Sequence, residues 1–512
     1  MELELQTIGA ETYESVGDIT LTQEESAETI VPDYCPDMAR VIATEGTVYL
    51  HGQELREGRA EVTGSVQVNI LYTPDGESGV RTLELSLPFT AESDNRALSD
   101  CAEVSAETVA ELLEARMLNP RKVLTRCRLA TRLTGYRKAA LRLTTDVITP
   151  EGRRIEKRRE RQKLVLLTQF IRREFQFSDT FALPSGRPGA VELLAADVSP
   201  DVTETKIIGN KLIVKGVFTL STLYLTDENQ CASQTAELPF SQILDVDDAP
   251  EDSPVSVRVT LSGSDIQLDG ADPDGREIAV TLYLEALAVV RREMEIELLR
   301  DLYSTAFETR YDAAPLTLIE SWTRQTCRQS VRETLETGMA ADEILSLRVL
   351  CGPVTVSAED GRGVLRVPAT IRVLYADEGG VTLVAERRIE VRADADCPDG
   401  YQITARAEVS EEPRGSVSER GVDVRFALDF RMEAVKFART LSVTAAELDT
   451  DAPKDAADAP SLVLRRMGPD ESAWDMAKAC NSTVAAILDA NQLTDEAELS
   501  RDALILIPRQ RG

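Results

Sequence analysis

The residue types that most often carry out chemistry in proteins are sparse in this 512-residue sequence. There is a single histidine, His51, which we expect in a loop; this excludes a histidine-rich metal site and leaves any Ser-His or Cys-His catalytic pair dependent on one residue. The spacings GxxxxGK(S/T), GxSxG, HExxH and DxDxDG are absent. Acidic pairs are common, but among 88 carboxylates a pair has no specificity for glycosidase chemistry. We therefore expect a protein that is not an enzyme and that needs no cofactor or metal.

One acidic loop and the cysteines need separate consideration. Residues 270–275 read GADPDG and could loosely hold calcium, but the later bidentate glutamate of a calcium loop is missing, so we favour a plain turn. The eight cysteines are scattered without a CxxC pair, which favours buried thiols over a disulfide framework or a zinc site. They are Cys35, Cys101, Cys127, Cys231, Cys327, Cys351, Cys397 and Cys480.

The overall charge excludes several classes of partner. Acidic residues outnumber basic ones by 88 to 57, and the resulting formal charge of −31 would repel nucleic acids and anionic lipid surfaces. Aromatic residues make up only 5% of the chain, which argues against stacking platforms for single strands. The hydrophobic fraction of 43% is ordinary for a folded protein, and the length predicts roughly three or four domains.

No segment predicts membrane insertion or export. The chain opens MELEL, without the basic and apolar regions of a secretory signal. The longest apolar runs, such as residues 164–167, are far shorter than the ~20 residues of a spanning helix. We therefore expect a cytoplasmic location and no direct membrane insertion.

Internal repetition is the main signal, with a period near 150 residues. The dipeptide Leu-Tyr begins at residues 71, 223 and 374, at steps of 152 and 151, and Ile42, Leu194 and Leu345 align at the same steps. The tripeptide Leu-Pro-Phe at residue 87 returns at residue 238. Two prolines of VPDYCPDM map onto two of LPSGRPGA at a step of 152 (Pro32, Pro36, Pro184, Pro188). These landmarks predict three tandem copies of one unit, and we expect the first two to be large enough to fold alone.

Within each unit the pattern is that of β-strands. A glycine-containing turn opens a run of alternating apolar and polar residues in 58–72, 209–224 and 361–375. A polar turn follows, with Asp, Asn or Gly supplying positions of φ > 0, and then a second alternating strand. Later runs also alternate (123–134, 277–289 and 422–430). Pro368 lies inside one of these strands, so we expect that strand at a sheet edge or a bulge. The sequence predicts a mainly β fold, with three tandem antiparallel β-sandwich-like repeats of about 150 residues.

The segments between repeats are charged. Residues 152–163 form the only basic cluster, which is either a solvated strand or helix face or a docking stripe for an acidic partner. Residues 293–345 have heptad-like apolar spacing around Trp322, and we expect helix there. Residues 447–460 are rich in Asp, Ala and Pro without periodicity, which indicates a linker.

The C-terminal residues 461–512 predict a small module of order βααβ. Leu462 and Leu464 begin a short strand, and Ser472 is a suitable N-cap for a helix that buries Trp474. A second helix spans residues 483–490, and residues 504–508 form a closing strand. In so small a module we expect Trp474 in the core rather than facing a ligand.

These motifs together resemble a known family. The βααβ order, with a Trp after an acidic-Ser turn and a terminal Leu-Ile-Pro, looks like a LysM domain. The repeats, with their hairpin ending in Leu-Tyr, their Leu-Pro-Phe, LPSGRP and LNPRK (residues 118–122), resemble the SipL SPOCS domain. Tandem SPOCS domains followed by LysM are similar to the SipL type of spore coat assembly protein of endospore-forming bacteria. The third repeat departs most, since it lacks Leu-Pro-Phe and LPSGRP.

The resemblance covers nearly the whole chain and gives a domain division. We expect an N-terminal segment at 1–29, SPOCS-like repeats at 30–180, 181–300 and, in divergent form, 301–446, an acidic linker at 447–460, and LysM at 461–512.

The resemblance also implies a function. It implies a non-enzymatic scaffold in endospore coat assembly that links a coat morphogenetic protein of the ATPase type to the forespore surface, in the cytoplasm of the mother cell. The alternative is a protein that binds peptidoglycan, through its N-acetylglucosamine glycan, in the cell wall or spore cortex. A cryptic hydrolase, the third possibility, would need a catalytic pair that the sequence does not offer.

The implied glycan- or partner-binding site consists of two LysM loops. Its residues are Asp470, Glu471, Ser472 and Ala473 in the first loop and Asn491, Gln492 and Leu493 in the second. The usual Gly-Asp-Thr-Leu of the first loop is replaced at all four positions, and a β-carbon with a carboxylate in place of glycine should crowd a sugar. We therefore expect the module to dock a protein better than it binds glycan.

Overall fold

The computed structural model describes residues 1–77, 79–151, 153–338, 340–359, 362–395, 400–454, 460–468, 470–499 and 503–510. Parts of several predicted features lie outside these ranges: Gly152 of the basic cluster, Gly361 of the predicted strand 361–375, the cysteine Cys397, residues 455–459 of the predicted linker, and residues 469, 500–502 and 511–512 of the predicted C-terminal module.

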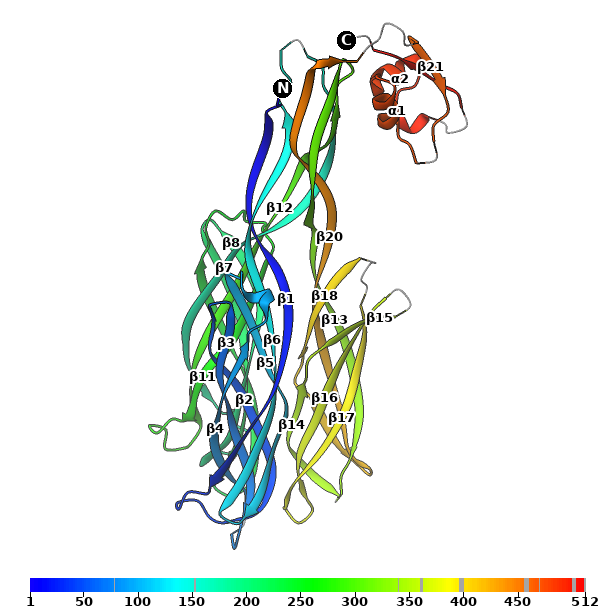
Figure 1. Cartoon of the computed structure of the whole chain (residues 1–512). Helices are drawn as coiled ribbons and strands as arrows, with labels where there is room; N and C mark the ends of the chain where they lie inside the picture. Colours follow the sequence, from blue (N-terminus) through cyan, green and yellow to red (C-terminus); the bar gives the residue numbers. More distant parts are fainter. Residues whose placement is uncertain are drawn as a thin grey trace.

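Most of the described chain forms antiparallel β-sheet, arranged as three units of one topology (Figure 1). The first unit contains β1 Leu5–Ile30, β2 Met38–Arg56, β3 Arg59–Pro74, β4 Arg81–Ser93, β5 Glu103–Asn119 and β6 Lys122–Val147. The second contains β7 Glu156–Ala182, β8 Glu192–Ile208, β9 Lys211–Leu225, β10 Cys231–Asp245, β11 Val255–Leu268 and β12 Glu277–Tyr303. The third contains β13 Phe307–Glu336, β14 Ala341–Cys351, β15 Thr355–Glu359, β16 Arg362–Asp377, β17 Thr382–Ala395, β18 Tyr401–Val409, β19 Arg414–Ser418 and β20 Gly421–Pro453.

Each unit pairs its first strand with its last. The sheet orders β1-β6-β5, β11-β12-β7 and β13-β20-β18 are the three versions of this arrangement, and a hairpin sheet such as β2-β3-β4 packs against each. The predicted hairpins correspond to β3–β4, β9–β10 and β16–β17, and Gly76, Asn229 and Gly380 in their turns have positive φ, as expected. The mainly β fold with antiparallel sheets is therefore confirmed.

The sheets group the chain differently from the predicted boundaries. β1 covers most of the predicted N-terminal segment 1–29 and pairs with β6 along its whole length, so it belongs to the sheet of the first unit. β7 lies within the predicted repeat 30–180 but pairs with β12 of the second unit. The predicted boundaries therefore separate each of these long first strands from the sheet that it joins.

The Leu-Tyr landmarks of the repeat lie at buried positions in all three units. Their tyrosines, Tyr72, Tyr224 and Tyr375, are at most 2% exposed, and each lies in the core of its own unit. The preceding leucines point the opposite way, as successive residues of a strand must. All three enter one cluster that the units share, together with the aligned residues Ile42, Leu194 and Leu345. Each unit therefore has a private core and contributes to a common one.

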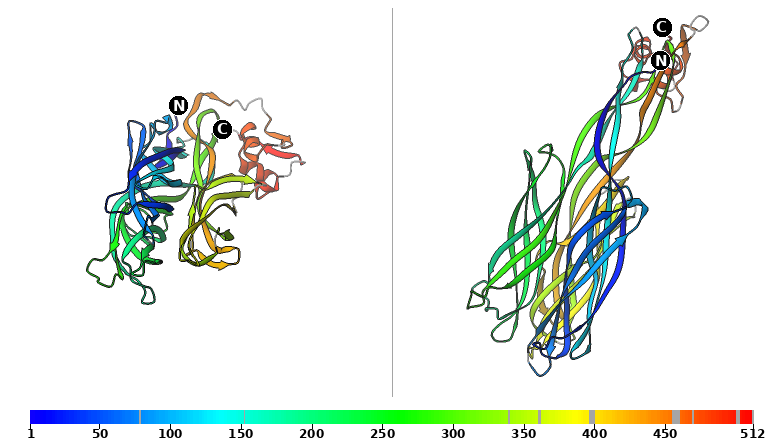
Figure 2. Two further views of the ribbon diagram at one scale, coloured as in Figure 1. Left: turned by 90° about the horizontal axis from the view of Figure 1, so that it is seen from below. Right: turned by 60° about the vertical axis from the view of Figure 1, so that its left-hand side comes forward.

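In each unit the hairpin sheet and the part of the long strands that packs against it form a lobe. Beyond the three lobes, the remaining parts of the long strands form three two-stranded ribbons, which together make a stalk (Figures 1 and 2). The ribbons are β1/β6, β7/β12 and β13/β20, and side chains from all three form two further shared clusters. Buried polar groups bond between ribbons, as where the Thr144 hydroxyl donates to the Val443 carbonyl at 2.6 Å. The first residues of the chain join the first unit to the third, because the Leu3 amide donates to the Ala446 carbonyl of the third unit at 2.8 Å.

Charged side chains also join the units. Arg291 of β12 is 7% exposed, and its guanidinium carbon lies 4.2 Å from the centroid of the Trp322 ring of β13. Glu433 of β20 accepts hydrogen bonds from Ser256 at 2.6 Å and from Trp322 and Arg291 at 3.3 Å each. Burial alone would raise the pKa of the Glu433 carboxyl, but Arg291 and these donors outweigh it and hold the pKa below its ordinary value.

A second ion pair links the first and third units. Arg348 lies 2.9 Å from Glu45, and both side chains are largely buried. In the neighbouring contact, between the first and second units, the Thr47 hydroxyl donates to Asp197 at 2.7 Å. Glu45, Asp197 and Arg348 occupy one repeat position, since they are 152 and 151 residues apart.

Two expectations about the connecting segments are wrong. Residues 293–345 form strands, not helix: β12 runs to Tyr303 and β13 begins at Phe307. Their apolar spacing departs from strict alternation at bulges such as the one between Ile319 and Ser321. Residues 447–453 of the predicted linker belong to β20, where Leu448 is fully buried in the stalk.

The prediction for Pro368 is also wrong, for an instructive reason. It lies in β16, the central strand of its sheet, and not in an edge strand. The neighbouring edge, however, is interrupted there: β14 ends at Cys351 opposite Ala369, and β15 begins at Thr355 opposite Arg366. The missing N–H of proline therefore costs no ladder hydrogen bond on that side.

The Leu-Pro-Phe landmark marks an exposed sheet edge. Pro88 lies in β4 and Pro239 in β10, each the outer strand of its hairpin sheet. A proline without an N–H makes an edge strand a poor template for pairing with another chain. In the third unit the aligned residue of β17 is Glu390, and a charge there serves the same purpose.

The shared core predicts a large effect for a single inward leucine. Leu223 is 1% exposed, so Leu223→Ala should lower the free energy of unfolding by about 2–5 kcal/mol. Leu118→Ala, at a side chain that is 45% exposed, should cost less than about 0.5 kcal/mol. Denaturant unfolding of the full chain measures both. Equal effects of the two changes would contradict a shared core. The expectation that a repeat folds alone stays a prediction, and an isolated repeat would expose these leucines.

Candidate partner-binding sites

The C-terminal module has the predicted order of elements. β21 Leu462–Arg465 pairs antiparallel with β22 Ile505–Pro508, and α1 Ala473–Ala479 and α2 Val484–Ala490 lie between them. Ser472 is the N-cap of α1 and forms a capping box with Asp475. The helices and the hairpin enclose a small core that includes Met476, Ile487 and Ile507.

Most of the seven predicted site residues hold the module together. Glu471 pairs with Arg465 and accepts from the Gly468 amide, while Asn491 donates to the Ile487 and Leu506 carbonyls at 2.7 Å each. Ala473 is buried, and Leu493 packs against the core. Only two of the seven, Asp470 and Gln492, are exposed. Five of the seven side chains thus serve the fold of the module, and binding through these loops stays a prediction.

The module docks on the stalk through α1. The Trp474 indole N–H donates to an Asp301 carboxylate oxygen at 2.7 Å, and the Lys478 ammonium donates to the other at 2.6 Å. The Tyr303 ring packs edge-on against Trp474, with centroids 4.9 Å apart, and its hydroxyl donates to the Ser482 carbonyl at 2.8 Å. Trp474 is 8% exposed. It therefore lies in a core, as the sequence predicts, but a core that includes part of the stalk.

We expect removal of the Asp301 carboxylate to loosen this docking. Asp301→Ala leaves the indole N–H and the ammonium without their shared acceptor, and hydrogen bonds to a charged partner contribute about 1.5–3 kcal/mol each. In a Trp322→Phe background Trp474 is the sole tryptophan, so its fluorescence emission should shift to the red. Asp312→Ala, at an exposed carboxylate of β13, is the matched control. Unchanged Trp474 emission in the Asp301 variant would show that docking rests on other contacts.

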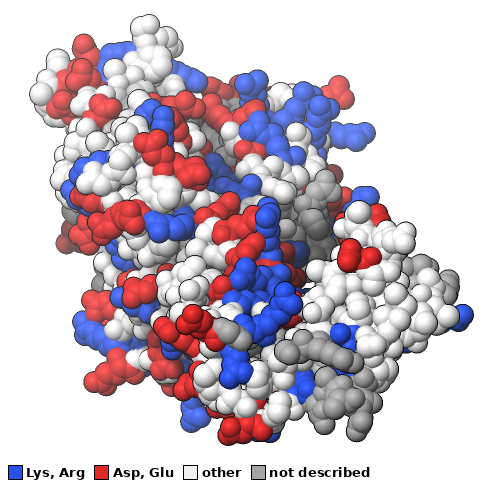
Figure 3. Space-filling view, turned by 90° about the horizontal axis from the view of Figure 1, so that it is seen from above, with Lys and Arg blue, Asp and Glu red and all other residues white. Residues whose placement is uncertain are grey.

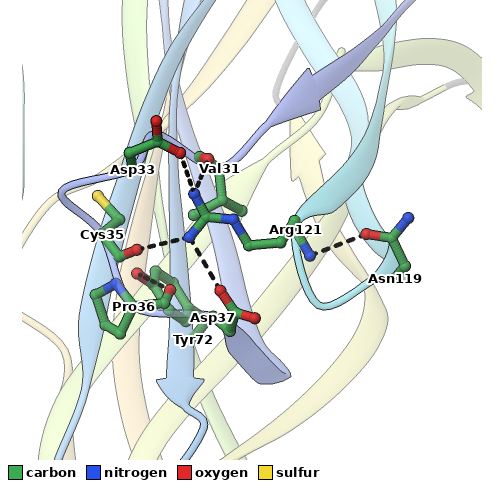
Figure 4. A network of polar contacts seen from close by, with 8 residues as sticks. All are labelled: Val31, Asp33, Cys35, Pro36, Asp37, Tyr72, Asn119 and Arg121. Carbon is green, nitrogen blue, oxygen red and sulfur yellow. Dashed lines mark hydrogen bonds and ion pairs between the residues drawn. The ribbon is translucent and has the colours of Figure 1, made fainter.

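At the far end of the first unit, Arg121 fixes the VPDYCPDM loop (Figure 4). Its guanidinium donates to the Val31 and Cys35 carbonyls and to the Asp33 and Asp37 carboxylates, all at 2.9–3.0 Å. The landmark Tyr72 hydroxyl donates to the Pro36 carbonyl from within the core, at 3.3 Å. The loop is thus held from two sides, and it presents Tyr34 to solvent at 88% exposure.

The second unit repeats this clamp with different residues. Arg276 donates to the Leu183 and Arg187 carbonyls at 3.0 Å each, which lie 152 residues after Val31 and Cys35. The Tyr224 hydroxyl donates to the Pro188 carbonyl at 3.3 Å. The prolines of LPSGRP and VPDYCPDM therefore mark one clamped loop. Arg121 lies in the LNPRK landmark, but its equivalence with Arg276 leaves no signal at the repeat period, because their step of 155 differs from that of the other landmarks.

Arg276 follows the acidic loop 270–275. There the Asp272 carboxylate accepts hydrogen bonds from the amides of Asp274, Arg276 and Glu277. These bonds close a turn and engage the oxygens that a calcium ion would need, which agrees with the plain-turn interpretation.

Removal of the clamp should release the first loop. Arg121→Ala leaves two carbonyls and two carboxylates without their donor, so we expect a loss of about 1–3 kcal/mol and faster amide exchange in residues 31–37. Arg121→Lys keeps the charge but not the fork of donors, and it should restore only part of the protection. Arg116→Ala, at an exposed position of β5, is the control. Unaltered exchange in Arg121→Ala would refute the clamp.

The basic cluster forms the start of β7 and the turn before it. Lys157 and Arg159 bond to Asp146 of β6 at 2.9 and 2.7 Å, and Arg161 lies 3.7 Å from Glu297 of β12. Figure 3, which looks onto the stalk end, shows acidic and basic side chains interspersed. The cluster is thus a solvated strand face with cross-strand ion pairs, and docking of an acidic partner there stays a hypothesis.

Burial disfavours the nucleophilic thiolate form of three cysteines. Burial raises the pKa of the Cys127 and Cys231 thiols to about 11 and that of Cys351 to about 12, so these thiols stay protonated at neutral pH. His51 lies in β2 rather than a loop, with its Nε2 2.9 Å from the Ser65 hydroxyl. Within the ranges that the structure describes, no carboxylate hydrogen-bonds to His51, and no three His, Cys, Asp or Glu residues gather as a metal site. The seven cysteines among these residues are free thiols.

The comparison with protein families agrees with the internal repeat. The family model described as SipL, SPOCS domain matches residues 37–118 and 190–269. No curated protein matches the chain. The chain is thus a β-repeat protein that carries two SPOCS domains. This is consistent with a protein of the SipL type and indicates a role related to sporulation.

The two matches cover equivalent parts of two units. Residues 37–118 contain β2 to β5, and residues 190–269 contain β8 to β11. The matched region therefore holds the hairpin sheet and the next strand, without the long strands of the stalk. In the helices that the structure describes, none is long and apolar enough to cross a membrane.

Proposed function

We propose that this protein is a non-enzymatic scaffold in endospore coat assembly, which links a coat morphogenetic ATPase to the forespore surface. The observation that carries the proposal is the pair of SPOCS domains within one shared core. Hydrophobic clusters shared by the three units at both ends of the molecule restrict the movement of one unit relative to another. Such restricted movement suits a protein that links two partners. The raised thiol pKa values support a role without catalysis, as does the setting of His51, whose hydrogen-bond partner among the described residues is the Ser65 hydroxyl and not a carboxylate.

We assign the C-terminal module to the LysM type, and we infer that it contacts a protein more readily than a glycan. Asp470 stands where LysM loops usually have glycine, and it is exposed at the surface of the module. Glu471 is engaged with Arg465, so its carboxylate does not point freely toward a sugar. Residues 461–512 carry six basic and eight acidic side chains, and a module of such mixed charge suits a specific protein contact at the forespore surface, within the mother cell.

Binding of the full chain to a purified coat morphogenetic ATPase tests the proposal. Asp470→Lys should weaken this binding about tenfold, which corresponds to 1.4 kcal/mol, whereas Glu378→Lys at an exposed turn of the third unit should leave it unchanged. Biolayer interferometry gives both affinities, and sedimentation with insoluble peptidoglycan gives the alternative. Saturable binding to peptidoglycan with no binding to the ATPase would overturn the proposal in favour of a wall- or cortex-binding protein.

A further inference from the structure

A cavity of about 620 Å³ lies between the three units, on the lobe side of the molecule. Equivalent strands line it: β2 contributes residues 44–50, β8 residues 198–200, and β14 and the next residues contribute 350–353. These strands carry the inward residues Ile42, Leu194 and Leu345 of the shared cluster close by. The cavity is therefore a product of the threefold arrangement, and its volume falls in the range of ligand sites.

The main chain of an edge strand borders the cavity. β5 is the outer strand of its sheet, and groups on its free edge are already used near one end: the Ala106 amide donates to Gln53 at 2.8 Å, and the Ala106 carbonyl accepts from Arg258. Because main-chain groups alternate along a strand, Thr108 and Ala110 direct theirs to the same side. Both residues line the cavity. A ligand with its own main-chain groups would find matching partners there.

Residues of the third unit line another side of the cavity. Its edge strand is interrupted between Cys351 and Thr355, next to Pro368, and Cys351, Gly352, Pro353 and Pro368 all line the cavity. In the first and second units the corresponding strands, β2 and β8, run on through this region. The third repeat thus lines the cavity with an irregular segment, in which the Gly352 amide still donates to the Pro368 carbonyl at 2.8 Å.

The charges of the lining select against a strongly charged ligand. Arg258 lies 3.4 Å from Glu107, Arg406 lies 3.1 Å from Glu408, and Arg372 pairs with Glu386. Arg388 and Glu111 also line the cavity, which gives four basic and four acidic side chains in all, so the lining offers no excess charge to a nucleotide or a polyanion. Aliphatic side chains such as Val48, Leu112 and Leu350 fill the spaces between these pairs.

We propose that this cavity binds an extended peptide segment of a partner protein, whose main chain hydrogen-bonds to the free edge of β5. This mode of recognition takes affinity from main-chain bonds and specificity from alternate side chains. The site is separate from the C-terminal module and does not depend on the function of that module.

Selection of phage-displayed random heptapeptides on the full chain tests the proposal. Leu350→Trp fills the cavity from a side chain that is 46% exposed, and Val356→Trp is a matched change, at 38% exposure, on the adjacent strand β15, outside the lining. Selected peptides should bind Leu350→Trp at least about tenfold more weakly than the unchanged chain, and Val356→Trp within about twofold. Methylation of alternate backbone nitrogens of a selected peptide should also weaken binding about tenfold.

Three outcomes would overturn the proposal. Failure to enrich any peptide, or equal binding of the selected peptides to both tryptophan variants, would exclude the cavity as the site. Full affinity of the N-methylated peptide would exclude main-chain recognition. Thermal unfolding of both variants, whose substituted side chains are partly exposed, verifies that neither change disrupts the fold.

Discussion

Burial of inward leucines where three units meet is the constraint on which this structure depends. Leu71, Leu223 and Leu374 leave the private cores that their neighbouring tyrosines enter, and they are buried only because the other two units are present. The same holds in the stalk, where a ribbon of two strands has no core without its neighbours. The units are thus folded pieces of one body. This differs from an arrangement of beads on a string, in which each bead keeps its apolar surface to itself.

The sequence allowed the hairpins, their turns and the C-terminal order of elements to be predicted, because each depends on local signals. Gly76 and Asn229 have positive φ because the turns in which they lie require it. The alternation of apolar and polar residues identifies β3, β9 and β16 without information from residues far away in the sequence. The contacts between units leave no such signal. The predicted boundaries assign most of β1 to an N-terminal segment outside the repeats, and the sequence predicts helix over β13 because bulges disturb its alternation.

The candidate site shows the same division. Ser472 was identified as a cap from its type and position, and the structure agrees. The resemblance places Asn491 in a binding loop, yet Asn491 holds β22 to α2, and an asparagine in a loop serves either purpose with the same sequence pattern. Asp301, which receives the module, lies 173 residues from Trp474, so no local pattern relates the two. Polar side chains of this kind fix both ends of the molecule: Asp301 at the stalk and Arg121 at the lobe.

Fusion of the three units into one chain permits an asymmetry that three separate copies could not have. Glu45, Asp197 and Arg348 occupy one repeat position, and in an assembly of identical subunits a single residue type would face itself there three times. In the fused chain Arg348 meets Glu45, while Asp197 meets a threonine. Because these contacts differ from one another, they favour a single arrangement of the three units, in which each unit has a fixed neighbour on either side. A mutation in one unit therefore changes one face of the molecule and leaves the equivalent faces of the other two units unchanged.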